Sequence, residues 1–560
     1  MNPECPWDEY PRPRLVRDSY MSLNGRWDFA VSGEDIPESF NEKILVPFPP
    51  ESALSGIGRE IKRGERLYYR RTFNLPKGFM KDRLILHFGA VDQIAEIFIN
   101  GVKVVQHEGG YLPFSADITD VLCKGENTIL VKVTDDLSHD YPYGKQKRKR
   151  GGMWYTPISG IWQTVWLESV PKIYIEEIKV TADMNRATVK ILGGEDKKRL
   201  TLSDGTVYEF FGDEITILPE KKILWSPENP YLYDFTLESG DDTVRSYFAL
   251  REIGVKNIDG IPKLTLNGEP YLFNGLLDQG YFPDGIYLPA TSDGYRDDIL
   301  LTKRLGFNTL RKHIKVEPDI FYTLCDRLGM IVFQDMVNNS SYSFIFDTVL
   351  PSAGMKRFPD YLLHRKKRSR DIFKAHMLDE IAYLDSHPSV LYYTVFNEGW
   401  GQFSADDMYA LAKAAAPDKI IDATSGWFVR HNSDVDSRHV YFKPIKIKKS
   451  PTRPLIISEF GGYSHRVEGH LFGDANYGYS ICKTKEELYL AIKRLYLSEV
   501  KAAILKGASG FIYTELSDIE DETNGFTTYD RQKLKVDEIK FKAIMDDLFT
   551  VFKALNSDKR

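Results

Sequence analysis

The segment Leu391-Tyr392-Tyr393-Thr394-Val395-Phe396-Asn397-Glu398-Gly399-Trp400 runs from apolar residues into polar residues and a glycine. A second segment, Pro454-Leu455-Ile456-Ile457-Ser458-Glu459-Phe460-Gly461-Gly462, is built in the same way. Both patterns predict buried parallel strands that end at a glutamate. A carboxylate at the exit of such a strand has no packing purpose, whereas in a (β/α)₈ barrel it would face the mouth where chemistry occurs.

The two glutamates form a candidate pair for hydrolysis of a glycosidic bond, with one as nucleophile and the other as acid/base. A retaining glycosidase needs the two carboxyl groups about 5–5.5 Å apart. The acid must also hold its proton near neutral pH, so burial or a negative neighbour must raise its pKa. The alternative is that each glutamate forms a structural ion pair with a loop arginine.

The C-terminal part of the chain alternates strand-like and helical runs. This pattern predicts one (β/α)₈ barrel over residues 255–560. The expected barrel strands are 271–276, 308–311, 331–334, 390–396, 420–424, 439–441, 455–458 and 510–514. Glu398 and Glu459 therefore lie at the ends of strands four and seven, which face each other across the mouth.

The N-terminal part is rich in strands. Residues 1–170 contain short apolar runs separated by turn signals such as Asn100-Gly101, which predicts a jelly-roll β-sandwich. Residues 171–254 contain shorter alternating runs, typical of a small immunoglobulin-like β-sandwich. The predicted fold class is therefore a multidomain β plus α/β protein with a C-terminal TIM barrel.

Composition excludes several function classes. The net charge of −6 gives no global attraction to nucleic acid or to a membrane surface. No apolar run approaches the roughly 18 residues needed to span a bilayer. The start, 1–7, lacks the features of a signal peptide, so we expect a cytoplasmic protein, although a signal that had been removed would leave no trace. Four scattered cysteines indicate free thiols: Cys5, Cys123, Cys325 and Cys482.

The chain resembles glycoside hydrolase family 2, whose members include β-galactosidases and β-glucuronidases. The resemblance rests on Asn24-Gly25-Arg26-Trp27, Ser159-Gly160-Ile161-Trp162-Gln163-Thr164-Val165-Trp166, Phe396-Asn397-Glu398 and Ser458-Glu459-Phe460-Gly461. It implies the same three domains and an exo-acting glycosidase that retains anomeric configuration. It also implies that Glu398 is the acid/base and that Glu459 is the nucleophile.

Several other residues are candidates for substrate binding. Arg311 resembles a family arginine that supports the nucleophile, and a cation there would keep Glu459 ionised. His313 follows it and either reaches the sugar or is a buried structural histidine. Tyr441 ends the sixth strand, where the family often has a tyrosine near the nucleophile, but it could equally be a core residue. Asn397 could bond a sugar hydroxyl.

Four further candidates are weaker. Asp278 follows the first strand. Trp400 and Trp427 could stack on the apolar faces of sugars, or pack a loop. Glu515 lies on the eighth strand where relatives often have a sugar-stacking tryptophan, so a more polar wall is expected there.

The sequence does not identify the sugar. Family glucuronidases carry an Asn-x-Lys motif, whereas the loop here reads Asn524-Gly525-Phe526-Thr527-Thr528. Some family galactosidases have an aspartate before the Ser-Gly-Ile signature, whereas this chain has a basic run at 145–150. That run predicts an acidic saccharide substrate if it borders the cleft, and is otherwise a solvated loop.

One rival function remains, a non-catalytic carbohydrate-binding protein on the same fold. A carbohydrate is the partner under either interpretation, and a homo-oligomer is left open. Nucleic-acid binding would need a joined basic face with interleaved aromatics, which the sequence does not show. No cofactor or required metal is predicted because no ligand cluster is evident, although family galactosidases can use Mg²⁺ or Na⁺.

Overall fold

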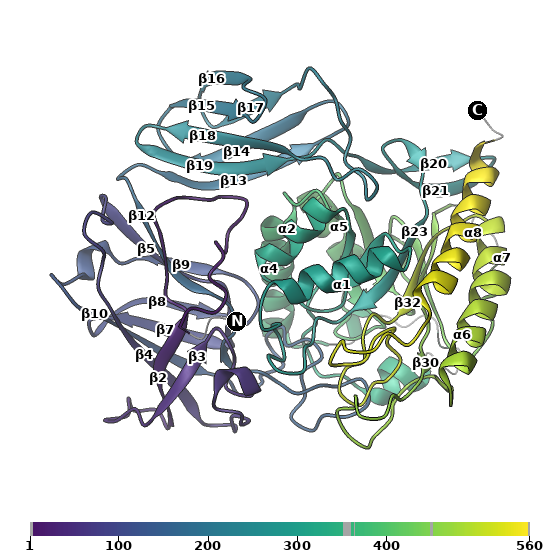
Figure 1. Ribbon diagram of the computed structural model, residues 1–560, viewed down its shortest axis with the longest axis horizontal. Helices are drawn as coiled ribbons and strands as arrows, with labels where there is room; N and C mark the ends of the chain where they lie inside the picture. Colours follow the sequence, from purple (N-terminus) through teal and green to yellow (C-terminus); the bar gives the residue numbers. More distant parts are fainter. Residues whose placement is uncertain (1–3, 351–354, 356–359, 363, 448–451, 558–560) are drawn as a thin grey trace.

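Two β-sandwiches pack beside a barrel (Figure 1). The computed structural model describes residues 4–350, 355, 360–362, 364–447 and 452–557. In Figure 1 the N-terminal sandwich lies at the left, the second sandwich at the top, and the barrel with its helices at the right.

The N-terminal sandwich consists of two antiparallel sheets, with strand orders β1-β12-β5-β9 and β3-β2-β4-β10-β7-β8, and of a separate short strand pair, β11-β6. Alternation places one side of each strand in the core, and in β10 the buried residues include Ile129, Val131 and Val133. The strands are β1 (Tyr20–Ser22), β2 (Gly25–Ser32), β3 (Glu42–Val46), β4 (Arg66–Phe73), β5 (Arg83–Phe88), β6 (Val91–Asp92), β7 (Ile94–Ile99), β8 (Val102–Glu108), β9 (Phe114–Asp117), β10 (Asn127–Thr134), β11 (Gly160–Ile161) and β12 (Val165–Val170).

The second sandwich packs a three-stranded sheet on a four-stranded sheet. Its strands are β13 (Ile175–Ala182), β14 (Ala187–Gly193), β15 (Lys197–Leu202), β16 (Val207–Phe211), β17 (Glu214–Ile217), β18 (Tyr233–Ser239) and β19 (Asp242–Phe248). Arg17 joins the two sandwiches, because its buried guanidinium donates to Glu168 at 2.9 Å and to Asp242 at 2.8 Å.

The barrel is a parallel sheet of eight strands in the order β27-β26-β25-β24-β23-β32-β29-β28. The strands are β23 (Phe273–Asp278), β24 (Thr309–Lys312), β25 (Ile331–Asp335), β26 (Val390–Asn397), β27 (Ile420–Ser425), β28 (Asp436–Val440), β29 (Leu455–Gly461) and β32 (Ala508–Thr514). At the seam between β27 and β28, the hydroxyls of Ser425 and Ser437 lie 3.1 Å apart.

Helices and a small sheet enclose the barrel. The helices are α1 (Asp293–Arg304), α2 (Asp319–Leu328), α4 (Lys367–Leu384), α5 (Ala405–Ala415), α6 (Lys485–Arg494), α7 (Lys501–Leu505) and α8 (Glu538–Ser557). The antiparallel sheet β20 (Ile253–Ile258), β21 (Ile261–Leu266) and β22 (Glu269–Pro270) covers the N-terminal ends of the barrel strands, because its Leu264 shares a hydrophobic cluster with Phe273 of β23 and Ile456 of β29. The opposite, C-terminal ends of the strands remain for the site.

The predicted fold class is confirmed, and all eight predicted barrel strands are present. The bounds of these strands differ from the predicted ones by up to three residues, which changes where candidate site residues stand. The first strand runs to Asp278, so this residue ends the strand instead of following it. The sixth strand ends at Val440, so Tyr441 follows it. The predicted domain boundaries at 170 and 254 stay predictions.

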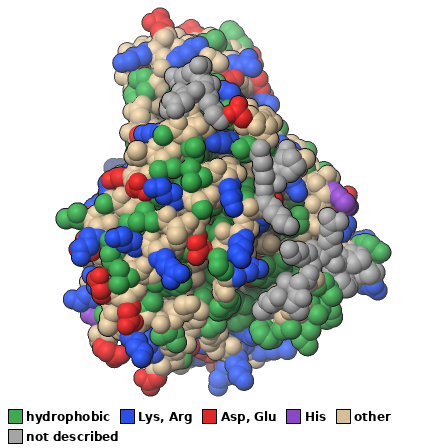
Figure 2. Space-filling view, turned by 90° about the vertical axis from the view of Figure 1, so that its right-hand side faces the viewer, with side chains coloured by type: hydrophobic (Ala, Val, Ile, Leu, Met, Phe, Trp, Pro, Cys, Tyr) green, Lys and Arg blue, Asp and Glu red, His purple; other side chains and the backbone are tan. Residues whose placement is uncertain are grey.

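The surface carries charges of both signs. On the face drawn in Figure 2, basic and acidic side chains of the described residues are interspersed. Within the described part of the chain, no helix is long and apolar enough to cross a membrane. The four cysteines, all in that part, are free thiols.

Candidate active site

Glu398 and Glu459 meet at the C-terminal end of the barrel. Glu398 directly follows β26, and Glu459 lies in β29. One side-chain oxygen from each glutamate and one ring nitrogen of His439 all lie within 4.8 Å of one another. Oxygens within this distance of each other fit the separation of about 5–5.5 Å that a retaining glycosidase requires between its two carboxyl groups.

The backbone turns sharply after each of the two strands. Glu398 has a φ of 54°, a left-handed conformation that costs energy in a residue with a side chain. Gly399 follows with a φ of 78°, and a Cβ atom there would lie 2.2 Å from the ring of Phe428. Gly461 has a φ of 85°, and its Cβ atom would lie 2.2 Å from the ring of Tyr513. Only glycine fits these two positions beside the glutamates.

Arg311 connects the two glutamate-bearing strands. Its side chain is 1 % exposed, and Nη1 donates to Glu459 Oε1 at 3.0 Å and to the Ser458 carbonyl at 2.9 Å. Nη2 donates to Asn397 Oδ1 at 2.9 Å. The predicted neighbours Arg311, Asn397 and Glu459 are therefore brought together by direct contacts.

Asp335, which the sequence reasoning missed, orients both Arg311 and His313. Its Oδ1 accepts from Arg311 Nε at 2.9 Å, and its Oδ2 lies 2.6 Å from His313 Nδ1. Burial lowers the pKa of His313 to about 4. A neutral His313 must donate from Nδ1 to the carboxylate, which leaves Nε2 as an acceptor. The sequence position could have identified Asp335 as a site residue, because it ends the third strand at the same edge of the barrel as the glutamates.

Tyr441 contacts the nucleophile candidate. Its hydroxyl donates to Glu459 Oε2 at 2.7 Å, and its ring stacks on Tyr479 at 3.9 Å. Burial raises the pKa of Glu459, but interactions with His439 and Arg311 outweigh this effect, with help from the Tyr441 hydrogen bond. The pKa of Glu459 therefore lies below the usual value of a glutamate, as a nucleophile requires.

His439 was also missed, although it lies within the predicted sixth strand. Its Nδ1 lies 2.7 Å from Glu398 Oε1 and 3.5 Å from Glu459 Oε2. Its Nε2 lies 2.9 Å from Ser425 Oγ. Gly426 makes room for this ring, because a Cβ atom there would lie 2.8 Å from it.

The same three groups, Glu398, His439 and Glu459, are a donor set that could hold a metal ion. Two features point instead to acid/base chemistry. The Arg311 guanidinium already neutralises Glu459 at 3.0 Å, and His439 is already bonded to Glu398. The prediction that no metal is required stays a prediction.

The remaining predicted residues lie in different surroundings. Asp278 is buried beside the site, where Lys312 Nζ donates to its Oδ2 at 2.6 Å and the Gly280 amide to its Oδ1 at 2.9 Å. Trp400 packs edge-on against Trp154 at 5.1 Å and is 3 % exposed, so it supports a loop more than it offers a stacking face.

Trp427 contacts His439, the histidine that lies between the two glutamates. Its ring meets the His439 ring edge-on at 5.5 Å, and its Nε1 donates to the Asp347 carbonyl at 3.1 Å. Burial raises the pKa of Asp347 to about 7, and the charge of Glu398 adds to this shift. No strand pattern pointed to Asp347, because it lies in a short π-helix, Ile345–Val349, in the connection after β25.

A second wall of the site lies around Glu515, the residue that follows β32. We use the name acceptor wall for the set Glu515, Gln279, Tyr155, Glu522 and Asn524. Gln279 Nε2 donates to Glu515 Oε2 at 2.8 Å, and Tyr155 donates to Glu522 Oε2 at 2.5 Å. Asn524 Nδ2 donates to Glu522 Oε1 at 3.0 Å. Three buried oxygens have no hydrogen-bond partner among the described residues: Glu515 Oε1, Gln279 Oε1 and Asn524 Oδ1.

Electrostatic coupling joins this wall to the glutamate pair. Burial raises the pKa of Glu522, and the charge of Glu459 adds to this, whereas Lys145 opposes it. Burial also raises the pKa of Glu515 well above its usual value, and Glu522 adds to the shift. The predicted polar character at the end of strand eight is therefore present as a set of carboxyl and amide oxygens.

The basic run at 145–150 does not form one free cationic patch. Arg148 donates to the carbonyls of Ile61 and Asp135. Lys147 lies 4.9 Å from the centre of the Trp154 ring. Arg150 pairs with Glu520 at 3.5 Å and covers Phe472. Lys145 is the member whose charge acts on the acceptor wall.

Known proteins match this chain in sequence and in fold. Residues 60–171 match the family model described as the sugar binding domain of glycosyl hydrolases family 2. A β-galactosidase of Thermoanaerobacter pseudethanolicus is 25% identical over 329 residues, which cover 54% of this chain and 43% of that protein. A β-glucuronidase of Paenibacillus borealis is 24% identical over 434 residues, which cover 70% of this chain and 69% of that protein.

A solved structure extends the match to nearly the whole chain. The β-D-glucuronidase of Dictyoglomus thermophilum has a TM-score of 0.76 at 20% identity, and the match covers 96% of this chain and 98% of that one. At this identity the likeness shows the fold. The matched part of this chain spans less than half the length of the T. pseudethanolicus β-galactosidase and about two thirds of the length of the P. borealis β-glucuronidase.

Proposed function

We propose that this chain, which belongs to glycoside hydrolase family 2, is a retaining exo-β-glycosidase that releases terminal neutral sugars. The observation that carries the proposal is the pair of facing carboxyl groups with oxygens within 4.8 Å. One of them is held by Arg311 and Tyr441, and the other is more accessible, since the Glu398 side chain is 18 % exposed and that of Glu459 is 6 % exposed.

In the first step, a Glu459 oxygen attacks the anomeric carbon while Glu398 gives its proton to the departing glycosidic oxygen. The bond to the leaving group breaks, and a covalent glycosyl ester forms on Glu459. Arg311 and Tyr441 keep Glu459 ionised before attack, because both donate hydrogen bonds to its carboxylate.

In the second step, Glu398 takes a proton from a water molecule, which attacks the anomeric carbon and releases Glu459. Glu398 must therefore exchange protons with the solvent side of the site, which agrees with its greater exposure. His439 lies between the two carboxyl groups and holds Glu398 in position.

The acceptor wall supports a neutral sugar. Its three unpartnered oxygens need hydrogen-bond donors, and sugar hydroxyls supply them. A uronate would bring a further negative charge toward Glu459, Glu515 and Glu522. The nearby Lys145 already acts on the last two of these.

The acidic substrate that the basic run predicts remains the alternative. Lys145 is the observation that favours it, because this half-buried residue acts by its charge on Glu515 and Glu522 and its ammonium has no hydrogen-bond or ion-pair partner among the described residues. A substrate carboxylate could pair with Lys145 if Glu515 and Glu522 were protonated.

A panel of 4-nitrophenyl β-glycosides separates these possibilities. We expect the largest kcat/KM with a galactoside, glucoside or xyloside, and the first product observed by NMR should have the β configuration. A preference for a glucuronide or galacturonide would overturn the neutral-sugar assignment and leave the mechanism intact. An α product would overturn the mechanism, and binding without turnover of any glycoside would support the non-catalytic alternative.

A further inference from the structure

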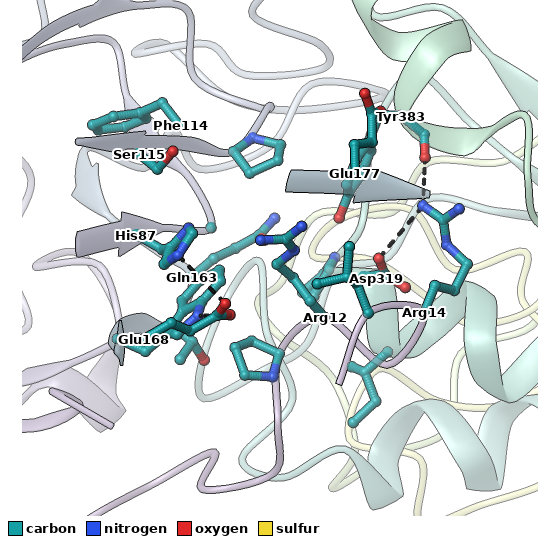
Figure 3. Close-up of a pocket in the computed structure, with 18 of the residues that line it drawn as sticks. Arg12, Arg14, His87, Phe114, Ser115, Gln163, Glu168, Glu177, Asp319 and Tyr383 are labelled. Carbon is teal, nitrogen blue, oxygen red and sulfur yellow. Dashed lines mark hydrogen bonds and ion pairs between the residues drawn. The ribbon is translucent and has the colours of Figure 1, made fainter. Parts of the chain in front are cut away.

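A cavity of about 440 Å³ lies between the two sandwiches and the barrel, away from the glutamates (Figure 3). Its walls come from the N-terminal segment 7–17, from the sheet that contains β5, β9 and β12, from β13 and β14, and from the barrel helices α2 and α4. Ligand sites typically have volumes of about 300–1,000 Å³ and occur where domains meet. Neither catalytic glutamate lines this cavity.

Two buried side chains in this cavity each have one nitrogen atom without a hydrogen bond. Gln163 is 5 % exposed, and its Nε2 has no hydrogen-bond partner among the described residues. His87 is 7 % exposed, and its Nε2 lies 3.8 Å from Glu168 Oε2, too far for a hydrogen bond, and makes no other hydrogen bond within that part of the chain. Burial lowers the pKa of His87 to about 3, so the ring is neutral. Burying such groups without a partner is unfavourable, which points to a ligand or ordered water that completes them.

Arg12 is the cation available to such a ligand. Its guanidinium donates to the Glu176 carbonyl at 3.2 Å and has no ion pair with any described carboxylate. Figure 3 shows Arg12 between His87, Gln163 and Glu168 on one side and Arg14 and Asp319 on the other. The other two arginines of the cavity already form ion pairs. Arg17 pairs with Glu168 at 2.9 Å, and Arg14 pairs with Asp319 at 3.7 Å.

The lining suits a neutral, hydroxylated molecule. Three arginines and five carboxylates line the cavity, so no single charge dominates. The lining offers donors on Arg12 and Gln163 and acceptors such as Glu177, and hydroxyl groups satisfy both kinds. Phe114 and Tyr383 add aromatic surface, which packs against the C–H faces of sugars.

We propose that this cavity is a second saccharide site, which binds one or two neutral sugar units independently of catalysis. It would hold a segment of glycan against the N-terminal sandwich, while the barrel acts on a chain end. The proposal does not depend on hydrolysis, so a chain that binds sugar here without cleaving any glycoside would still support it.

The test is saturation-transfer NMR on the full chain with methyl β-D-galactopyranoside and lactose. The catalytic site is first blocked with a covalent 2-fluoro galactoside, and mass spectrometry confirms the label. We expect saturation transfer to persist in the blocked chain, and the affinity obtained by titrating this signal to fall at least about tenfold in Arg12→Met, as loss of one charged hydrogen bond would produce. Label formation tests the proposed function separately from sugar binding: if no label forms, the same variants are compared with the parent on the unblocked chains, and equal signals in all of them would still overturn the second site.

Two further variants make the result decisive. Ser115→Trp, at an exposed position on the cavity wall, fills the space without removing a buried group and should also abolish the signal. Arg63→Met removes an exposed arginine that does not line the cavity and should bind like the unmodified chain. Equal signals in all four blocked proteins, or no signal in the blocked parent, would overturn the second site.

Discussion

The two walls of the candidate active site differ in how completely their polar groups are paired. Around Glu459, both carboxylate oxygens accept hydrogen bonds, and Arg311 uses all three of its nitrogens. In the acceptor wall, three buried oxygens have no partner among the described residues. The first wall is complete without substrate, whereas the second is left for substrate to complete.

This difference separates chemistry from recognition. A nucleophile must be ionised and aligned before the sugar arrives, so its partners belong to the protein. A specificity wall gains discrimination when its polar groups are satisfied only by the correct substrate. Changes in the first wall should therefore alter kcat, and changes in the second should alter KM or stability.

The largest effect is expected from Glu459→Gln. An amide cannot form the glycosyl ester, so kcat should fall by about 10⁴-fold or more. Mass spectrometry after treatment with a 2-fluoro glycoside should find the label on Glu459 in the unmodified chain. Glu468→Gln, at an exposed position, is the matched control and should retain full activity. A label on another residue would exclude Glu459 as the nucleophile.

Glu398→Ala should give an effect that depends on the leaving group. General acid catalysis typically increases the rate about 10²–10⁴-fold, and substrates with poor leaving groups depend on it most. We expect a large loss with alkyl glycosides and a small loss in the first step with dinitrophenyl glycosides. Azide should accelerate the second step and yield a β-glycosyl azide. A uniform loss without azide rescue would contradict the acid/base role.

Tyr441→Phe should have an intermediate effect. The variant loses one hydrogen bond to a carboxylate, which should lower kcat by about 10- to 100-fold. That bond also helps to hold the pKa of Glu459 below its usual value. Its loss should raise this pKa, so the acidic limb of the kcat/KM profile should move to higher pH. Tyr231→Phe, in the second sandwich, is the control, and an unmoved acidic limb would show that Tyr441 acts only in packing.

The smallest effect is expected in the acceptor wall, from Glu515→Gln. Burial and Glu522 raise the pKa of Glu515 above the unfolded value of about 4.3, so its ionisation opposes folding as pH rises. The glutamine variant lacks this penalty and should melt higher on the order of 1–2 °C at pH 8. At pH 4 the two proteins should melt together. A variant that melts lower at pH 8 would place the Glu515 carboxylate in a stabilising role.

Much of the fold could be predicted from local patterns. Each barrel strand is a short apolar run, and such runs must be buried on both faces of a parallel sheet. Glu398 and Glu459 stood out because polar residues at strand ends break that pattern. Errors of one or two residues, as at Asp278 and Tyr441, arose because hydrophobicity does not mark where hydrogen-bonded pairing stops.

The sequence by itself determined the class of each sandwich, the barrel and the two glutamates, because periodicity and strand-end polarity are local properties. Only the tertiary structure decided which side chains serve them. Asp335, His439 and Glu522 lie on different strands and loops, and their roles depend on distances that spacing along the chain does not encode. The burial that shifts the pKa values of Glu459 and Glu515, and the cavity beside Arg12, likewise arise only when separate sheets and helices pack together.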